Sequence, residues 1–147
     1  MSVHVRSILA RKGGEVFTVS PDATVSDAIR TLREKNVGAL VVSPTGTDIV
    51  GIVSERDIVR RMATDGAASL TRQVSEIMTP DVTTCRADDS ADGLMGVMTA
   101  ARIRHVPVVD GDELVGLISI GDVVKSYVDE LEVEKEALAG YVTGSAY

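Results

Sequence analysis

Two short polar motifs with the same spacing are the residues of this chain best suited to chemistry. They are Ser54-Glu-Arg-Asp57 and Ser119-Ile-Gly-Asp122, and each follows a short apolar run. A serine followed three residues later by an acid can cap a helix, because the hydroxyl and the carboxylate each accept a backbone N–H. The same helical turn offers N–H groups and a hydroxyl to a phosphate, and its carboxylate can accept both hydroxyls of a ribose. The two interpretations are compatible, and the spacing leaves both open.

Groups able to catalyse a reaction are scarce in the chain. It contains two histidines and one cysteine, and no Ser-His-Asp or metal-ligand spacing is present. Cys85 aligns with Val19 in the repeat described below, which favours a buried small side chain over a redox centre. We therefore predict that the protein is not an enzyme and needs no metal or catalytic cofactor.

Composition excludes several other classes of protein. With 15 basic and 22 acidic residues, the net charge of −7 disfavours binding to the phosphate backbone of nucleic acids. No apolar run approaches the roughly 20 residues that a membrane-spanning helix needs, and the first residues lack the apolar core of a signal peptide. A single cysteine cannot form an intrachain disulfide. These features predict a cytoplasmic protein that binds neither nucleic acid nor membrane.

The two motifs belong to an internal repeat. Val16–Arg61 matches Val82–Ser126, with an offset of 66 residues that falls to 65 after one turn. In each copy a β-rich run precedes a helix whose entry has capping residues; in the first copy these are Thr24 and Asp27. Two apolar runs follow, and in the second copy they are joined by the hairpin signal Asp110-Gly111. A second helix then starts after Ser54 or Ser119, which gives the order β-α-β-β-α.

A unit of about 46 residues buries too little surface to be stable alone. We therefore predict an α/β (α+β) fold in which two tandem β-α-β-β-α modules pack about a pseudo-twofold axis. Residues 1–72 would contain an N-terminal segment and the first module, residues 73–128 the second module, and residues 129–147 a C-terminal helix and tail. The clefts between the modules are then the natural ligand sites.

The chain resembles the cystathionine-β-synthase (CBS) domain family, in which stand-alone proteins carry two modules in tandem. The resemblance covers nearly the whole sequence: the helix entries PDATV and DDSA, EIMTP before the second module, the strands VGALVV and IRHVPVV, and both G-h-h-S-x-x-D endings, where h is apolar. No single piece is specific, whereas the ordered set is. The resemblance implies that Asp57 and Asp122 hold the ribose of an adenine nucleotide.

The resemblance also implies two crossed sites, each combining the motif of one module with strands of the other. One site would join Ser119, Gly121 and Asp122 to Phe17, Val37, Gly38 and Ala39. The second would join Ser54, Arg56 and Asp57 to Thr83, Ile103 and Arg104. Backbone groups beside Phe17 or Thr83 would contact the adenine edge, and Val37 or Ile103 would cover its face.

Arg102-Ile103-Arg104-His105 is the densest positive cluster of the acidic chain. We interpret Arg102 as a solvated helix end. Arg104 and His105 occupy a position where the family often places basic residues toward phosphates, and the first copy has Gly38 and Ala39 there. The phosphate-binding end of the ligand site is therefore expected to be asymmetric.

These observations favour a regulatory protein that binds an adenine nucleotide, with AMP first and NAD or ATP next. Such a protein would act on a separate protein partner, which the sequence does not identify. The alternative is a structural dimerisation module with vestigial ligand sites. Homodimerisation is expected from the resemblance and from an apolar stripe in the last helix that comprises Val123, Val124, Tyr127, Val128 and Leu131.

Overall fold

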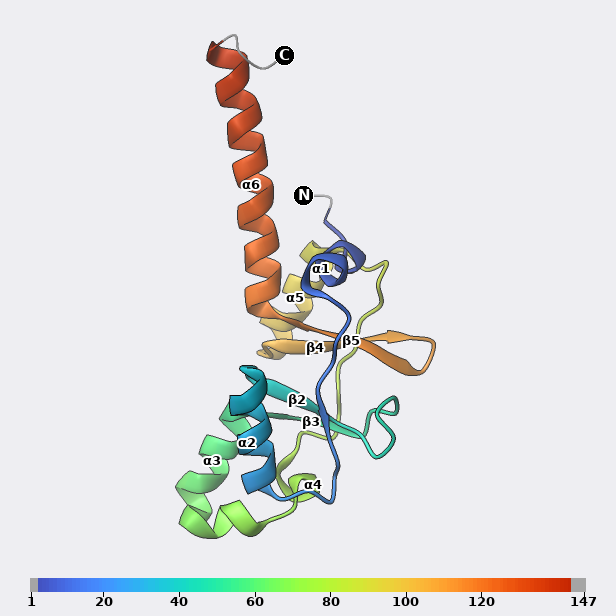
Figure 1. Cartoon of the computed structure of the whole chain (residues 1–147), viewed down its shortest axis with the longest axis vertical. Coiled ribbons are helices and arrows are strands. Elements are labelled where there is room, and N and C mark those ends of the chain that lie inside the picture. Colours follow the sequence, from blue (N-terminus) through green and yellow to red (C-terminus); the bar gives the residue numbers. More distant parts are fainter. Residues whose placement is uncertain (1–2, 144–147) are drawn as a thin grey trace. The chain divides into compact units, whose positions relative to one another are not determined.

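The computed structural model describes residues 3–143, whose contacts form two compact units (Figure 1). The first-repeat unit contains Gly14–Arg86 and Val106–Leu117. The second-repeat unit contains the chain up to Gly13, Ala87–His105 and the chain from Ile118 onward. Neither unit is one continuous stretch of sequence, so the contacts divide the chain differently from the linear boundaries at residues 72 and 128.

The first-repeat unit is built on a three-stranded sheet in the order β1-β2-β3. Strands β1 and β2 are parallel, with Thr18 opposite Val41, and β2 and β3 are antiparallel, with Leu40 opposite Val53. The elements of this unit are β1 (Thr18–Val19), α2 (Val25–Lys35), β2 (Ala39–Val42), β3 (Gly51–Ser54), α3 (Glu55–Asp65), the 3₁₀ helix η1 (Gly66–Thr71) and α4 (Val74–Ile77). The first five helices and strands after the N-terminal segment thus confirm the predicted β-α-β-β-α order.

The start of α2 follows the predicted capping chemistry. The Thr24 hydroxyl accepts the backbone N–H of Asp27, and the Asp27 carboxylate accepts the backbone N–H of Thr24. One face of the helix carries apolar residues into a core that also contains residues of all three strands. The buried members of this core are Val19, Val25, Ala28, Leu32, Leu40, Val42, Val53, Ile58, Val74 and Ile77.

The second repeat contains α5 (Ala91–Ala101), β4 (His105–Asp110), β5 (Glu113–Ser119) and α6 (Ile120–Thr143). Strands β4 and β5 pair as a hairpin, and Gly111 in its turn has a φ of 62°, a conformation that glycine adopts without a steric penalty. Cys85 forms a parallel bridge to Val108 where the first copy has the strand β1. Cys85 is buried, which confirms the interpretation of this residue as part of the packing.

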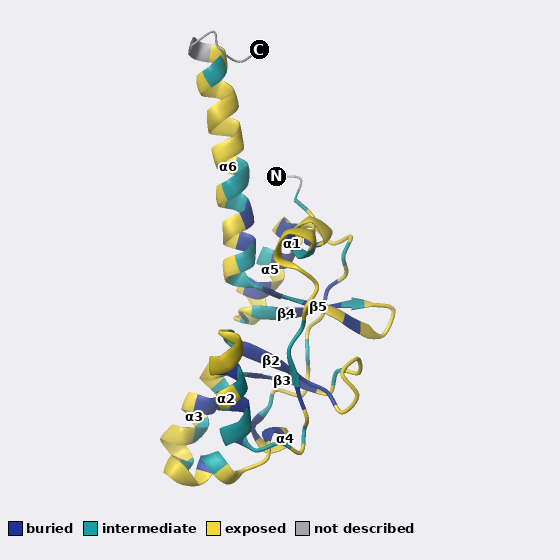
Figure 2. Ribbon diagram, viewed as in Figure 1, coloured by how far each residue is buried: buried dark blue, intermediate teal, exposed yellow. Residues whose placement is uncertain are grey.

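The N-terminal segment forms a helix, α1 (Val5–Lys12), that packs in the second-repeat unit. Val5 donates its N–H to the carbonyl of Asp89, and Arg6 donates to that of Ala87. Helices α1 and α5 contact the first part of α6, and the rest of α6 runs beyond them with most of its surface exposed (Figure 2). Within the described residues, no helix combines the length and the apolar character needed to cross a bilayer.

Candidate ligand-binding site

Ser54 and Asp57 form a complete helix cap at the junction of β3 and α3. Asp57 Oδ2 accepts the backbone N–H of Ser54 at 2.9 Å, and the Ser54 hydroxyl accepts the N–H of Asp57 at 3.3 Å. The second carboxylate oxygen, Oδ1, accepts a long hydrogen bond of 3.4 Å from the Thr79 hydroxyl. Asp57 is half-buried, so its carboxylate is held in place without being sealed from solvent.

Ser119 and Asp122 repeat the same cap where β5 meets α6. Asp122 Oδ2 accepts the backbone N–H of Ser119 at 2.9 Å, and the Ser119 hydroxyl accepts the N–H of Asp122 at 3.1 Å. The capping interpretation of both motifs is therefore confirmed. Because the caps fix both carboxylates on the first helical turn, they also hold them where a ribose could be bound.

The environment of Asp122 contains a cation that was not among the predicted site residues. Lys12, the last residue of α1, donates from Nζ to Asp122 Oδ2 at 2.6 Å. Burial alone would raise the pKa of Asp122, but the hydrogen bonds from Lys12 and Ser119 and the charge of Lys12 outweigh it and lower the pKa below the usual 3.8. The carboxylate is consequently ionised at neutral pH and already has a charged partner.

Each motif lies beside a hollow in its own unit. Asp122 lines a cavity of about 310 Å³ together with Ile8, Arg11, Lys12, Lys125 and Ser126. Asp57 lines one of about 230 Å³ together with Arg60, Arg61, Thr64 and Ile77. Both cavities combine an acid that can accept hydroxyls with cations that can attract an anion. No group of three or more metal-ligating side chains occurs in the described part of the chain.

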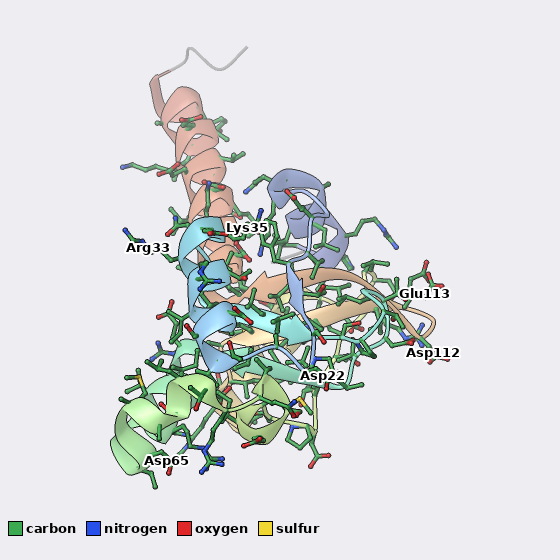
Figure 3. The ribbon with its side chains drawn as sticks, turned by 60° about the horizontal axis from the view of Figure 1, so that its bottom comes forward. Asp22, Arg33, Lys35, Asp65, Asp112 and Glu113 are labelled. Carbon is green, nitrogen blue, oxygen red and sulfur yellow. The ribbon has the colours of Figure 1, made fainter. Side chains whose placement is uncertain are left out.

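The strand residues of the first predicted site lie in the first-repeat unit, whereas its motif lies in the second. Phe17 is half-buried against the core of its unit, and Lys35 Nζ lies 5.1 Å from the centre of its ring (Figure 3 labels Lys35). Val37 and Gly38 are half-buried and Ala39 is buried. Gly121, in the motif, is exposed. The crossed combination of these residues stays a prediction.

The second predicted site likewise draws on both units. Arg56 and Thr83 are exposed in the first-repeat unit. Arg104 is exposed in the second-repeat unit, where Ile103 and His105 are half-buried. The carbonyl of Arg104 accepts the N–H of Ile120 at 2.8 Å, so this strand entry lies at the start of the helix of its own repeat.

Arg102 ends α5 as expected. It is exposed and has a φ of 56°, in the left-handed region. Asn36, its counterpart in the first copy, ends α2 with a φ of 53°. The interpretation of Arg102 as a helix end is therefore confirmed.

Comparison with known proteins identifies the family. The family model described as the CBS domain matches twice, over residues 5–64 and 74–129. The chain belongs to the CBS-domain family. Its two matched segments make it a tandem pair of CBS modules, and the first segment includes α1, which the internal repeat had left outside the modules.

Relatives and solved structures agree with this assignment. The CBS domain-containing protein CBSX3, mitochondrial, of Arabidopsis thaliana is 34% identical over 97% of this chain and 73% of its own length. The CBS-domain containing protein ATU1752 of Agrobacterium tumefaciens is 45% identical, with a TM-score of 0.83 over 85% of this chain and 99% of its own. The CBS domain pair of protein MJ0100, solved with 5′-methylthioadenosine and S-adenosyl-L-methionine, is 25% identical, with a TM-score of 0.78 over 88% and 99%.

Lys12 is the residue of this CBS pair that sequence reasoning missed. A signal for it exists, because Val5-Arg-Ser-Ile8-Leu matches Val74-Ser-Glu-Ile77-Met at an offset of 69 residues. Extending the repeat in this way would have predicted that the N-terminal segment packs on the second module as α4 packs on the first. The contact between Lys12 and Asp122 would then have been open to prediction.

Proposed function

We propose that the protein is a regulatory sensor that binds an adenine nucleotide, with its ribose held by Asp57 or Asp122. The observation that carries the proposal is the repeated cap, which fixes a carboxylate at the start of a helix beside a cavity lined by cations. Support comes from the MJ0100 pair, whose two named ligands both contain adenosine. The proposed ligand therefore has an adenosine group in common with both ligands of that solved structure.

AMP is the ligand we favour, followed by ATP or NAD. Each cavity presents at least two basic side chains, which suit a ligand that carries phosphate. Arg104 and His105 belong to the same proposal as further phosphate contacts.

The bound nucleotide would act as a signal rather than a substrate. The polar groups of the two motifs are engaged in helix caps, in which the serine hydroxyl accepts a backbone N–H and the carboxylate accepts another. We therefore propose no catalysis, and an effect on a separate protein whose identity is open. A cytoplasmic location is part of the proposal, although one relative is named as mitochondrial.

We also propose that the protein forms a homodimer through α6. Val124, Val128, Leu131 and Leu138 are 46–65% exposed and follow one another at intervals of four, three and seven residues. Such intervals place them on one helical stripe suited to a second helix. Val123 is fully buried in its own unit, and therefore the expectation that it belongs to this stripe was wrong. Light scattering of the full chain measures the mass directly.

Calorimetric titration of AMP into the Asp57→Asn and Asp122→Asn variants tests the ribose role. Each substitution removes a charged acceptor worth about 1.5–3 kcal/mol, so affinity at that site should fall by about 10-fold to 100-fold. Asp27→Asn is the matched control, because Asp27 caps α2 with the same geometry and has no proposed ligand. It should lower stability and leave binding unchanged, because an acid in the first turn of a helix is favourable there whether or not a ligand binds.

The opposing result is equally clear. If Asp57→Asn and Asp122→Asn behave like Asp27→Asn, with lower stability and full affinity, both acids are caps only. The sites would then be vestigial, and the protein would be a structural dimerisation module.

A further inference from the structure

Helices α1 and α4 occupy equivalent places in the two repeats. Val74 donates its N–H to the carbonyl of Ala23 at 2.8 Å, and Val5 donates to that of Asp89 at 2.9 Å. Ala23 and Asp89 are themselves counterparts, since they are 66 residues apart. Each module is therefore completed by a helix of matching sequence that precedes or follows it along the chain.

The two helices differ, however, in the side chain that contacts the nearby aspartate. Helix α4 ends at Ile77, and Thr79 then contacts Asp57 through a neutral hydroxyl at 3.4 Å. Helix α1 continues to Lys12, which contacts Asp122 through an ammonium group at 2.6 Å. One carboxylate of the repeat therefore has a neutral hydroxyl as its third partner, whereas the other belongs to an ion pair.

Further cations line both cavities. The cavity beside Asp122 is lined by three cations and one acid, and the cavity beside Asp57 by two cations and one acid. Lys12 and Asp122 are about one-third and one-quarter exposed, so their ion pair is only partly screened by water. A ligand at Asp122 must compete with Lys12 for Oδ2, which also accepts the cap hydrogen bond from Ser119.

We propose that Lys12 makes the Asp122 site selective for ligands that carry a phosphate next to the ribose. The inference rests on the proposed function. A phosphate gives the Lys12 ammonium a new anionic partner, and this frees Asp122 to accept the ribose hydroxyls. A neutral nucleoside offers no such partner and must either break the ion pair or share its carboxylate. The Asp57 site, where a threonine stands in place of the lysine, lacks this selection.

The test compares AMP with adenosine in proteins that keep one site. The Asp57→Asn background keeps the Asp122 site, and the Asp122→Asn background keeps the Asp57 site. Calorimetry on Asp57→Asn/Lys12→Met should show AMP affinity reduced by about 10-fold or more, the effect of one lost charge-assisted hydrogen bond. Adenosine affinity should be unchanged or higher, so the preference for AMP falls by the same factor.

Three further variants separate this role from a structural one. Lys12→Arg keeps the charge and should keep the preference for AMP. Arg6→Met removes the same charge from α1 at an exposed residue outside the cavity lining, and it should leave both affinities unchanged. Lys12→Met in the Asp122→Asn background should change neither affinity.

Four results would overturn the inference. Equal loss of AMP and adenosine affinity on Lys12→Met would show that Lys12 only supports the fold of the site. An equal change in both single-site backgrounds would show a general effect of charge. If neither Asp57→Asn nor Asp122→Asn alters AMP binding, the proposed function itself fails and the Lys12 inference with it. Loss at both carboxylates with unchanged selectivity on Lys12→Met refutes the Lys12 inference alone.

Discussion

Gly51, the first residue of β3, offers a sharp test of the packing behind the Asp57 motif. A Cβ atom added to Gly51 would lie 2.4 Å from Sδ and 2.9 Å from Cγ of Met78, and 3.1 Å from the carbonyl oxygen of Thr79. The methionine could move, but the carbonyl belongs to backbone that pairs with Ile52. We therefore expect Gly51→Ala to be destabilising through lack of space.

The size of the effect follows from the cost of overpacking. Extra methyl groups in a filled core cost about 1–3 kcal/mol. In a chain of this length each kcal/mol lowers Tm by about 2–4 °C, so a fall of roughly 2–12 °C is expected. Gly96→Ala is the matched control, because Gly96 lies within α5 and its Cβ would meet nothing within 4 Å. That change should raise stability by up to about 1 kcal/mol, the helix propensity of alanine over glycine.

Urea and thermal unfolding of both variants decide the matter. The two alanines should shift stability in opposite directions, and Gly51→Ala should cost less in a Met78→Ala background, where the closest atoms are gone. A neutral or stabilising Gly51→Ala would refute the close packing. An undiminished cost in the Met78→Ala background would show that Met78 is not its cause. Because Thr79 also contacts Asp57, we expect Gly51→Ala to weaken ligand binding at that site as well.

Two other predictions concern α6. Burial and a 2.5 Å hydrogen bond to Asp92 raise the pKa of Tyr127 to about 12, so its contribution to stability is full below pH 10 and is lost as the pH rises through 12. Tyr127→Phe should flatten the fall in unfolding free energy over this pH range, whereas Tyr141→Phe, at a highly exposed site, should not. Identical pH profiles for the two variants would contradict the role of the hydrogen bond between Tyr127 and Asp92. For the dimer, Leu131→Glu should give a monomer in light scattering, whereas Val133→Glu, which lies outside the apolar stripe, should stay dimeric. A monomeric mass for the unmodified chain would refute the proposed interface.

Local chemistry explains what the sequence predicted correctly. The capping pair Thr24 and Asp27, the hairpin at Gly111 and the helices after Ser54 and Ser119 each depend on residues within a few positions of one another. Their energies come from hydrogen bonds and backbone preferences that a short segment carries by itself. The repeat doubled the evidence for the helices after Ser54 and Ser119, because the Ser-x-x-Asp pattern occurs in both copies.

Helix α1 escaped prediction because its stabilising partners are distant in sequence. It has eight residues, and only Val5 and Ile8 among them are buried. An isolated helix of that length is marginal in water, so it depends on the carbonyls of Ala87 and Asp89 and on contact with α6. The ion pair between Lys12 and Asp122 forms only when α1 is packed in this way. Because the two residues are 110 positions apart, no short-range sequence pattern predicts their contact.

The two modules differ in the group that contacts the capping aspartate, and this difference affects which ligand each aspartate can accept. Both repeats use the same cap to aim a carboxylate, because the serine N–H binds Oδ2 in each. What differs is the third partner, a hydroxyl at Asp57 and an ammonium at Asp122. A hydroxyl can yield to a ribose with little change in charge, whereas separating an ion pair requires a replacement anion. Under the proposed function, two sites with the same helix cap would therefore prefer different ligands of the adenosine class.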